Sequence, residues 1–406
     1  MYRRAQIWIC YTLCLALVSL PRAARGNITT AATKTLDWCI PQCMCLSNTQ
    51  ILCNTGGLRD IPTSLPSNLE ELSLSKNEFG TIRNDAFSQL RHLKKLYLDG
   101  NVIQEIRPFA FRGLNKLLAL SIQYTPLSYI GEFSFAALQN VSGIVLSHNK
   151  IAHIKANAFA GSSHIGIIVL SNNPLKSIHS HAFSGLTYVG HLVLPGGIKS
   201  IEPDAFNGLE QVGQLKMTFM DLEGVKPYTF RGLKNVNHLL IQTSDLGVIH
   251  KDAFFGLEHI DQLNIVSNKI DAIEEFHLAS NFSINVLHFH KNHVLKAPKY
   301  GDASFRVNRI STEENHFPCD CQIHLVLESD FVNGSVDEFR RHNFCISTAE
   351  FNGKPMSVVD LESIASCHDR LTKDNYGSGV SVRSNRLCFA LVIGFMGMSR
   401  RLGLLL

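Results

Sequence analysis

The sequence predicts an α/β solenoid with a parallel β-sheet on its concave face and disulfide caps at both ends. One apolar pattern recurs about every 24 residues, in about ten copies, from Leu69 to about Ala297. Eight cysteines form two groups of four on either side of these copies, and none lies inside them. A unit of this length cannot bury its own apolar face, so neighbouring copies must stack into an elongated array.

Changes in composition along the chain define six regions. These are residues 1–26, a signal peptide; 27–68, an N-terminal cysteine cap; 69–298, the repeats; 299–368, a C-terminal cysteine cap; 369–386, a polar stalk; and 387–406, a hydrophobic tail. The repeats can exceed the size of an ordinary domain without dividing, because each copy contacts only its neighbours.

Each copy begins with a short strand. In the first copy Leu72 and Leu74 alternate with Ser73, which is the spacing of a strand with one buried and one exposed face. Asn77 follows where the chain must turn, and its side chain can bond to backbone groups that the bend leaves unpaired. The rest of the copy is too irregular for a long helix, and its phenylalanines should stack in one column: Phe87, Phe111, Phe135, Phe159, Phe183, Phe206, Phe230 and Phe254.

This pattern resembles the leucine-rich repeats of extracellular proteins, including Slit-like and other small cell-surface members, and implies a horseshoe fold. The asparagine position departs from the family pattern at Thr125, Gly197, Met220 and Ser244. We therefore expect the side-chain hydrogen-bond ladder to be interrupted there and the corner to be looser or water-bridged. One copy is a residue short near Pro195, which predicts a local break in curvature.

The two cysteine groups resemble the caps that close the ends of such arrays. The resemblance implies four disulfides: Cys39 with Cys45, Cys43 with Cys53, Cys319 with Cys345, and Cys321 with Cys367. Spacing alone leaves three pairings in each group. The alternative for the first group is a zinc site, which an oxidising compartment disfavours, so we expect no metal and no cofactor.

The first 26 residues have the layout of a secretory signal. Arg3 and Arg4 precede an apolar run that is too short to span a membrane, and Ala23 and Ala24 follow it. Four sequons agree with this route, at Asn27, Asn140, Asn281 and Asn333. Asn140 directly precedes the apolar residue that opens a copy, so we expect its glycan on the outer, non-sheet side.

The C-terminal region suggests attachment to a membrane by a lipid. The apolar run from Leu387 to Met398 would form a helix of about 18 Å, too short for roughly 30 Å of hydrocarbon. Small residues, a polar spacer and an apolar tail instead resemble a signal for a glycolipid (GPI) anchor, with Gly377 or Ser378 as acceptor. A freely secreted form and a true membrane span are the alternatives.

Charge and motifs exclude several classes of function. The net charge of +4 includes four arginines in the signal peptide and four near the C-terminal end, Arg383, Arg386, Arg400 and Arg401. Without these eight the body is near −4, so nucleic-acid binding is not expected. The chain has no Gly-rich phosphate loop and no Gly-x-Ser-x-Gly elbow. The surface of a solenoid is also open to water, so we expect no enzymatic activity.

The outward strand positions should form one concave face that binds an extracellular or cell-surface protein. It is polar near its ends and apolar in the middle, and exposed apolar surface on a secreted protein favours a partner. The candidate contact residues are Tyr97, Tyr124, Val145, Ile167, Val169, His191, Val193 and Leu240. The alternative is that β-branched residues simply suit strands. A homodimer through this face is a further alternative.

Five histidines lie on or beside this face: His148, His191, His238, His288 and His290. Protonation near pH 6 could release a partner, although ordinary polar surface is the simpler interpretation. Two of them, His288 and His290, could bind a metal but have no obvious third ligand.

Two classes of function remain. The first is a cell-surface recognition protein that acts in adhesion or as a co-receptor. The second is a secreted, matrix-associated structural protein, and an innate-immune pattern-binding protein is a third alternative that sequence does not separate from these.

Overall fold

The computed structural model describes residues 39–274, 283–298, 307–346, 351–362 and 364. The chain divides into two units after Cys39, and the fold is that of the second, which begins at Ile40. Outside the described residues lie the signal peptide, the hydrophobic tail, Asn27, Asn281, Cys367, Gly377 and Ser378. No helix within the described ranges is long and apolar enough to cross a membrane.

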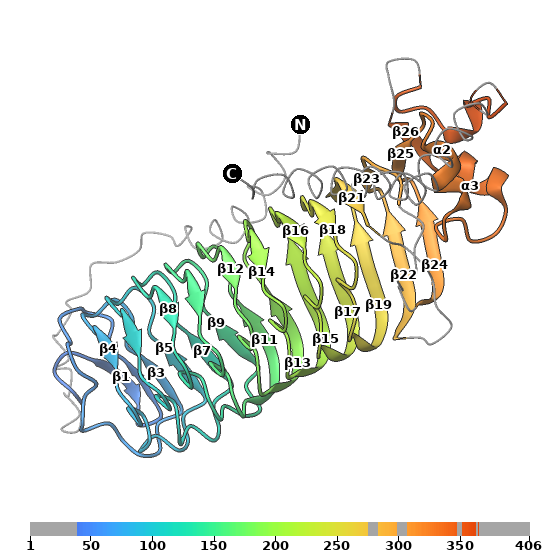
Figure 1. Cartoon of the computed structure of the whole chain (residues 1–406). Coiled ribbons are helices and arrows are strands. Elements are labelled where there is room, and N and C mark those ends of the chain that lie inside the picture. The colour runs from blue at the N-terminus through green and yellow to red at the C-terminus, as the bar shows by residue number, and fades with distance from the viewer. Residues whose placement is uncertain (1–38, 275–282, 299–306, 347–350, 363, 365–406) are drawn as a thin grey trace, which may run out of the picture. The chain divides into compact units, whose positions relative to one another are not determined.

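A 13-stranded sheet runs along the whole array (Figure 1). In spatial order its strands are β1 (Met44–Ser47), β2 (Gln50–Leu52), β3 (Glu71–Ser73), β5 (Lys95–Tyr97), β7 (Ala119–Ser121), β9 (Gly143–Val145), β11 (Ser163–Val169), β13 (Leu186–Val193), β15 (Leu209–Thr218), β17 (Lys234–Gln242), β19 (Glu258–Val266), β22 (Ile284–His290) and β24 (Val307–Glu313). Only β1 and β2 pair antiparallel; the other pairs are parallel. The parallel solenoid predicted from the repeat is confirmed.

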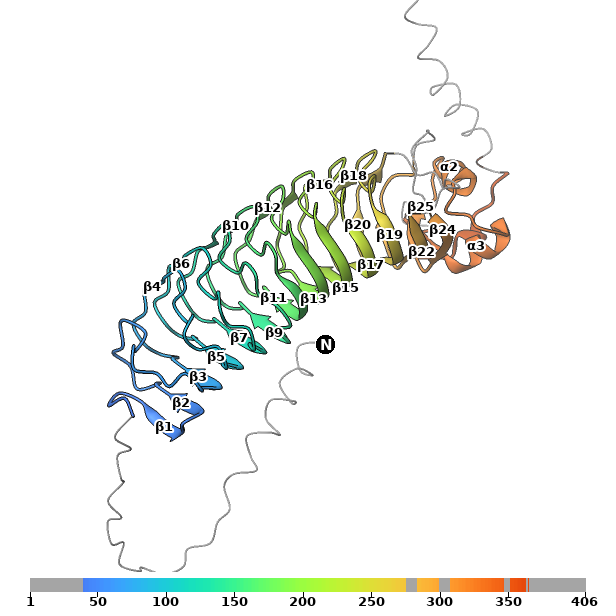
Figure 2. The same ribbon diagram turned by 90° about the horizontal axis from the view of Figure 1, so that it is seen from below.

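The array extends beyond the predicted repeats at both ends. Strand β2 adds a parallel rung before the first repeat, and β24 adds one after the last. Strand β24 lies in the region that we assigned to the C-terminal cap, so that region also contains a turn of the array. The strands of the sheet line the inner side of the stacked turns (Figure 2).

Strand length changes in the middle of the array. Strands β3, β5, β7 and β9 have 3 residues each, whereas β11 has 7 and β15 has 10. The change gives the second half a broader concave sheet, which the uniform repeat length did not predict.

The return paths contain turns and very short strands. These are β4 (Thr81–Ile82), β6 (Glu105–Ile106), β8 (Tyr129–Ile130), β10 (His153–Ile154), β12 (Ser177–Ile178), β14 (Ser200–Ile201), β16 (Gly224–Val225), β18 (Val248–Ile249), β20 (Lys269–Ile270), β21 (Ala272–Ile273), β23 (His293–Val294), β25 (His316–Pro318) and β26 (Phe344–Ile346). The described helices, α2 (Ile323–Glu328), α3 (Val336–His342) and the 3₁₀ turn η1 (Met356–Val358), all lie in the C-terminal cap. The helical part of the predicted α/β class is therefore confined to that cap.

The core is the apolar interior of the stacked turns. The predicted phenylalanine column is confirmed: rings from Phe87 to Phe254 stack in sequence, with centroids 5.0 to 6.2 Å apart. The inward strand residues, such as Leu72 and Ile168, are fully buried. Each ring therefore packs between two others, and only the ends of the column need a cap.

Buried asparagines bridge the turns at the corner after each strand. Asn101 Nδ2 donates to the carbonyls of Leu74 and Leu98, at 2.9 and 2.7 Å, and its Oδ1 accepts the N–H of Asn77 at 3.1 Å. One side chain thus satisfies backbone groups of two turns that the bend leaves unpaired.

The expected interruption of this ladder is wrong at Thr125 and Ser244. Thr125 Oγ1 donates to Asn149 Oδ1 at 2.8 Å, and Ser244 Oγ accepts the N–H of Met220 at 3.0 Å. At Gly197 the backbone N–H donates to the carbonyl of Phe219 instead, at 2.7 Å. A hydroxyl is short enough to occupy the corner and still reach the next turn, so side-chain bonds persist at Thr125 and Ser244. Gly197 and Met220 contribute only backbone bonds, so the side-chain ladder is interrupted at these two positions as expected.

Disulfides are present at both ends. Cys43 is bonded to Cys53, and Cys319 to Cys345, as the resemblance implies. The remaining described cysteines, Cys39, Cys45 and Cys321, are disulfide-bonded as well. The pairings of Cys39 with Cys45 and of Cys321 with Cys367 stay predictions.

Candidate interaction surface

The centre of the concave face carries a row of three valines. Val169 on β11 lies directly opposite Val145 on β9 and Val193 on β13. All three are half-buried, while the residues that precede them in each strand are fully buried. The inward residues already fill the core, so the three valines lie on the surface and are not required for core packing.

Ile167 extends this row on one side. Its strand neighbours are Gly143 and His191. A Cβ added at Gly143 would lie 3.5 Å from Ile167 Cγ2, so the glycine leaves that side of the isoleucine uncovered. Ala119 lies beyond Gly143 in the same row. Two small residues therefore leave one side of Ile167 without a neighbouring side chain.

We expected the apolar residues of the concave face to form one group in its middle, and this expectation is wrong for Leu240. Val193 is paired with Lys216 on β15, and Lys216 with Leu240 on β17. A lysine therefore separates Leu240 from the valine row. Tyr97 is similarly separated from Val145, with Ser121 between them.

Tyr124 lies at the corner that follows β7. Its side chain is 64% exposed, and its ring centroid is 4.8 Å from that of His148 in the next turn. Asn172, one turn further, donates from Nδ2 to His148 Nε2 at 3.1 Å. These three residues, which all have positive φ, form a row along one edge of the concave face that we call the corner row.

Phe219 extends the corner row, two turns beyond Asn172, and we include it in that row from here on. The sequence alone did not single it out. It is 66% exposed, with φ +58°, and it precedes Met220 as Tyr124 precedes Thr125. A Cβ at Gly196 would lie 3.1 Å from Phe219 Cβ, so the glycine in the shortened turn allows the turn of Phe219 to pack closely against it. The sequence signal for Phe219 is an aromatic residue directly before the asparagine position of the repeat. The alternation of residues within the strands does not reveal Phe219, because it lies after the strand.

Polar groups occupy both ends of the concave face. At the N-terminal end Lys95 Nζ lies 3.3 Å from Glu71 Oε2, and Ser121 Oγ donates to Asp99 Oδ1 at 2.7 Å. At the other end His290 Nε2 lies 2.8 Å from Ser311 Oγ. The predicted polar ends and apolar middle are therefore present on the described strands.

Of the two histidines at the C-terminal end, His290 resists protonation. The rings of His288 and His290 lie 5.5 Å apart, edge to face. Burial, and then the neighbouring His288, lowers the pKa of His290, although Glu313 and Glu314 act in the opposite direction. Within the described ranges no group of three metal-ligating side chains is assembled.

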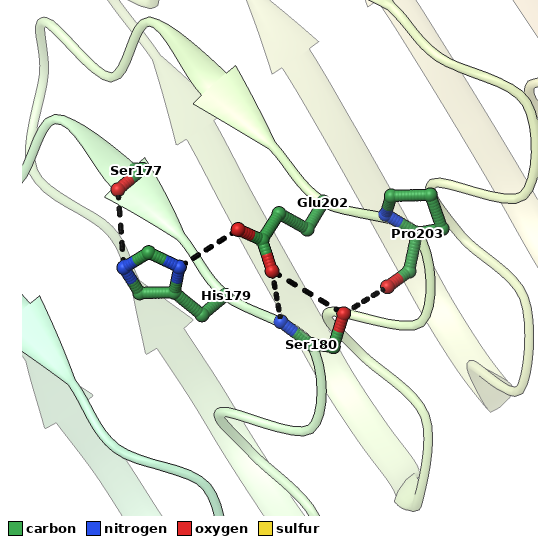
Figure 3. A network of polar contacts seen from close by, with 5 residues as sticks. All are labelled: Ser177, His179, Ser180, Glu202 and Pro203. Atoms are coloured by element: carbon green, nitrogen blue, oxygen red, sulfur yellow. Dashed lines mark hydrogen bonds and ion pairs between the residues drawn. The ribbon is translucent and has the colours of Figure 1, made fainter.

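A serine, a histidine and a glutamate are in contact on the return path (Figure 3). His179 Nε2 lies 3.3 Å from Ser177 Oγ, and His179 Nδ1 lies 2.8 Å from Glu202 Oε1. The N–H of Ser180 donates to Glu202 Oε2 at 2.9 Å. That bond, and then the one with His179, holds the pKa of Glu202 below its ordinary value.

The same contact recurs three turns later without a serine. His250 Nδ1 lies 3.2 Å from Glu274 Oε1, and the N–H of Lys251 donates to Glu274 Oε2 at 2.9 Å. Val248 stands two residues before His250, as Ser177 stands before His179. The shared feature is thus a histidine–glutamate contact that ties adjacent turns together, so we assign it a structural role.

Two of the four sequons lie within the described residues. Asn140 is exposed. It lies at the edge of the concave sheet where the strands begin, because Gln139 bridges to Ser163, the first residue of β11. It is therefore nearer to the sheet than expected. Asn333 is also exposed, and its Nδ2 donates to the carbonyl of Ile310 at 3.3 Å.

Comparison with known families finds the repeat in three segments. Residues 80–213 match the family described as BspA type leucine rich repeat region, in 6 copies. Residues 215–270 and 68–90 match two families that are both described as leucine rich repeat.

Similar proteins match parts of the chain. Three are named leucine-rich repeat-containing protein 4, from Rattus norvegicus, Mus musculus and Homo sapiens, and each is 30% identical over 92 residues. This stretch is 22% of the chain and only 12% of each relative. The crystal structure of human 5T4 (Wnt-activated inhibitory factor 1, trophoblast glycoprotein) aligns at 17% identity and a TM-score of 0.39, covering 80% of this chain and 98% of that one.

Proposed function

Because this chain is a leucine-rich repeat protein with disulfide-bonded ends, we propose that it recognises a protein partner at the cell surface through the centre of its concave face. The contact would comprise the valine row, Ile167 and the corner row. Its role would be adhesion or that of a co-receptor.

The observation that carries this proposal is the unbroken apolar row Val145, Val169 and Val193. Adjacent strands place these side chains in direct contact positions, although the core beneath is already filled. Neighbouring turns hold polar residues at the same position, namely Ser121 and Lys216, so the strand itself does not require valine. Contiguous exposed apolar surface of this kind marks interaction sites.

The surroundings of the row match the anatomy of a protein interface. Exposed aromatic rings, Tyr124 and Phe219, stand at the corner row, and aromatic residues often supply much of the binding energy. Burying one half-exposed valine or isoleucine stabilises a complex by about 1 kcal/mol. Polar residues at both ends of the face would form a solvated rim.

The secretory route is part of this proposal. Disulfides in both caps support an oxidising compartment. Attachment to the membrane would use a glycolipid on Gly377 or Ser378, as their small side chains and the apolar tail suggest. Release from intact cells by a phosphatidylinositol-specific phospholipase would support the anchor; retention after treatment would contradict it.

The recognition function is tested with a charged double variant. A partner is first identified by proximity labelling on intact cells, and its affinity for the purified protein is then measured. Ile167→Lys with Val169→Lys should weaken binding at least 100-fold, because two charges would be buried. Gln262→Lys with Asn264→Lys is the matched control, since these residues occupy the same two rows on β19.

Equal affinity of the two variants would contradict the proposal. Both variants should melt within about 3 °C of the natural protein, because all four side chains lie on the outward face. Self-association that the first variant abolishes would identify the partner as a second copy of the chain.

A further inference from the structure

A second row of exposed side chains follows the entry edge of the concave sheet. Each member directly precedes the buried residue that opens a turn and has φ between +53° and +58°. The members are Asn140, His164, Tyr188, Gln211, Asn235 and His259. We call this the entry row; it lies at the opposite ends of the strands from the corner row.

Asn140 is the immediate neighbour of His164 in this row. Gln139 is bridged to Ser163, and Ser163 is paired with Thr187, so the residues that follow them are also in register. The N–H of Asn140 donates to the carbonyl of Ser163 at 3.1 Å. The row therefore runs from a sequon asparagine to a histidine and then to Tyr188.

The next two members form an exposed aromatic stack. The rings of His164 and Tyr188 are 4.5 Å apart and only 7° from parallel, and Tyr188 is 49% exposed. Because Tyr188 covers one face of the imidazole, the other face is directed toward the turn of Asn140. A flat aromatic surface thus lies beside the sequon.

A strip without side chains lies next to this stack. Gly166, Gly190 and Gly213 follow the entry row in three consecutive turns, and Ser142 of the sequon occupies this position one turn earlier. A Cβ at any of these glycines would lie 2.4 to 2.5 Å from a carbonyl oxygen of the preceding turn. Further along the array the equivalent positions carry side chains, and Asn285 Nδ2 donates to Asp261 Oδ1 at 2.9 Å. The bare strip is therefore confined to the turns that follow Asn140.

We propose that an N-linked glycan on Asn140 folds over the His164–Tyr188 stack and lies along the glycine strip. The apolar C–H faces of pyranose rings pack against aromatic rings, and the sugar hydroxyls can bond to polar members of the row such as Gln211. The sugars would lie over bare backbone, because the carbonyl of the preceding turn takes up the room that a side chain would need at each of these glycines. This proposal rests on the secretory route of the proposed function.

A glycan in this position would restrict how a partner approaches. It would cover the entry row while leaving the valine row and the corner row open, because these lie further along the same strands. The partner would then dock from the edge that carries Tyr124 and Phe219.

Hydrogen exchange on the full-length glycoprotein from a eukaryotic host tests this proposal. Mass spectrometry first measures occupancy of Asn140. Ser142→Ala, which removes the sequon but keeps Asn140, should raise exchange at least threefold in peptides spanning Ser163–His191. Asn333→Gln, which removes a sequon elsewhere, should leave these peptides unchanged. Digestion of the folded natural protein with peptide-N-glycosidase F, which leaves an aspartate at position 140, should reproduce the Ser142→Ala result while Ser142 stays in place.

A further variant separates the stack from the glycan. Tyr188→Asn keeps a residue that tolerates positive φ, and in this variant glycan removal should change exchange less than it does in the natural protein. Unchanged exchange after removal of an occupied glycan would overturn the proposal, as would an unoccupied Asn140 beside an occupied Asn333. If neither site is occupied, the secretory route of the proposed function fails as well.

Discussion

Ile167 and Gly143 lie opposite each other on adjacent strands, and the glycine leaves one side of the isoleucine uncovered. This relationship distinguishes the centre of the concave face from its polar ends. A partner side chain would pack against this uncovered side of Ile167, so covering it is a direct test of its use.

Gly143→Leu should weaken partner binding at least tenfold by covering this side of Ile167. The new Cβ would lie at ordinary contact distance from Ile167, and Gly143 does not have positive φ, so the change should shift the melting temperature by less than about 3 °C. Titration calorimetry measures the affinity. Unaltered affinity in a fully folded variant would show that this side of Ile167 is not part of the interface.

Phe219→Gly should weaken binding without loss of stability. The ring is exposed, and relief of its left-handed conformation offsets the backbone entropy that glycine adds, each term being about 1 kcal/mol. Thr243→Gly is the matched control, because Thr243 holds the same position one turn later with φ +50°. Surface plasmon resonance should show a larger loss for Phe219→Gly; equal losses would exclude a specific role for the ring.

Asn149→Ala should destabilise the array far more than Thr125→Ala. Asn149 Nδ2 donates to the carbonyls of Ile122 and Leu146, so its removal leaves buried carbonyls unpaired and costs about 3 kcal/mol or more. Thr125 contributes one hydroxyl to the same ladder, and its loss should cost about 1 kcal/mol. Urea unfolding followed by circular dichroism gives the comparison. Similar midpoints for both variants would contradict the importance of the ladder.

Acid should destabilise the junction with the C-terminal cap. His316 on β25 lies between His293, at 4.3 Å between ring centroids, and Phe344, at 5.3 Å. Burial, and then His293, lowers the pKa of His316 below 6.5.

The folded state therefore binds protons less readily than the unfolded chain. The contribution of His316 to the free energy of unfolding is fully present above pH 6.5, and it is lost as the pH drops from there toward the lowered pKa. His316→Phe, which retains the ring stack, should make the melting temperature less dependent on pH between 7 and 5. An identical pH profile for the variant would exclude His316 as the source.

The sequence predicted those features of the fold that the repeat spacing determines directly. The inward leucines and the phenylalanine column followed from residues that recur in register. The corner was harder to predict, because Thr125 and Ser244 replace the asparagine amide with a hydroxyl whose reach only coordinates reveal. The additional rung β24 was hidden by its place among cap residues.

The candidate site was predicted in part for a similar reason. Alternation within a strand correctly placed Val145, Val169 and Ile167 on the outward face. It does not report which neighbours intervene, so the separation of Leu240 by Lys216 was overlooked. Phe219 stands outside the alternating positions, where the chain adopts positive φ, and spacing alone gave it no weight.

The most direct test of the central claim is the footprint of a bound partner, measured by hydroxyl-radical labelling of the complex. We predict protection of Val145, Ile167, Val169 and Val193, together with Tyr124 and Phe219, while the short strands of the return paths remain labelled. Protection confined to the return paths, with the valine row still reactive, would contradict the account.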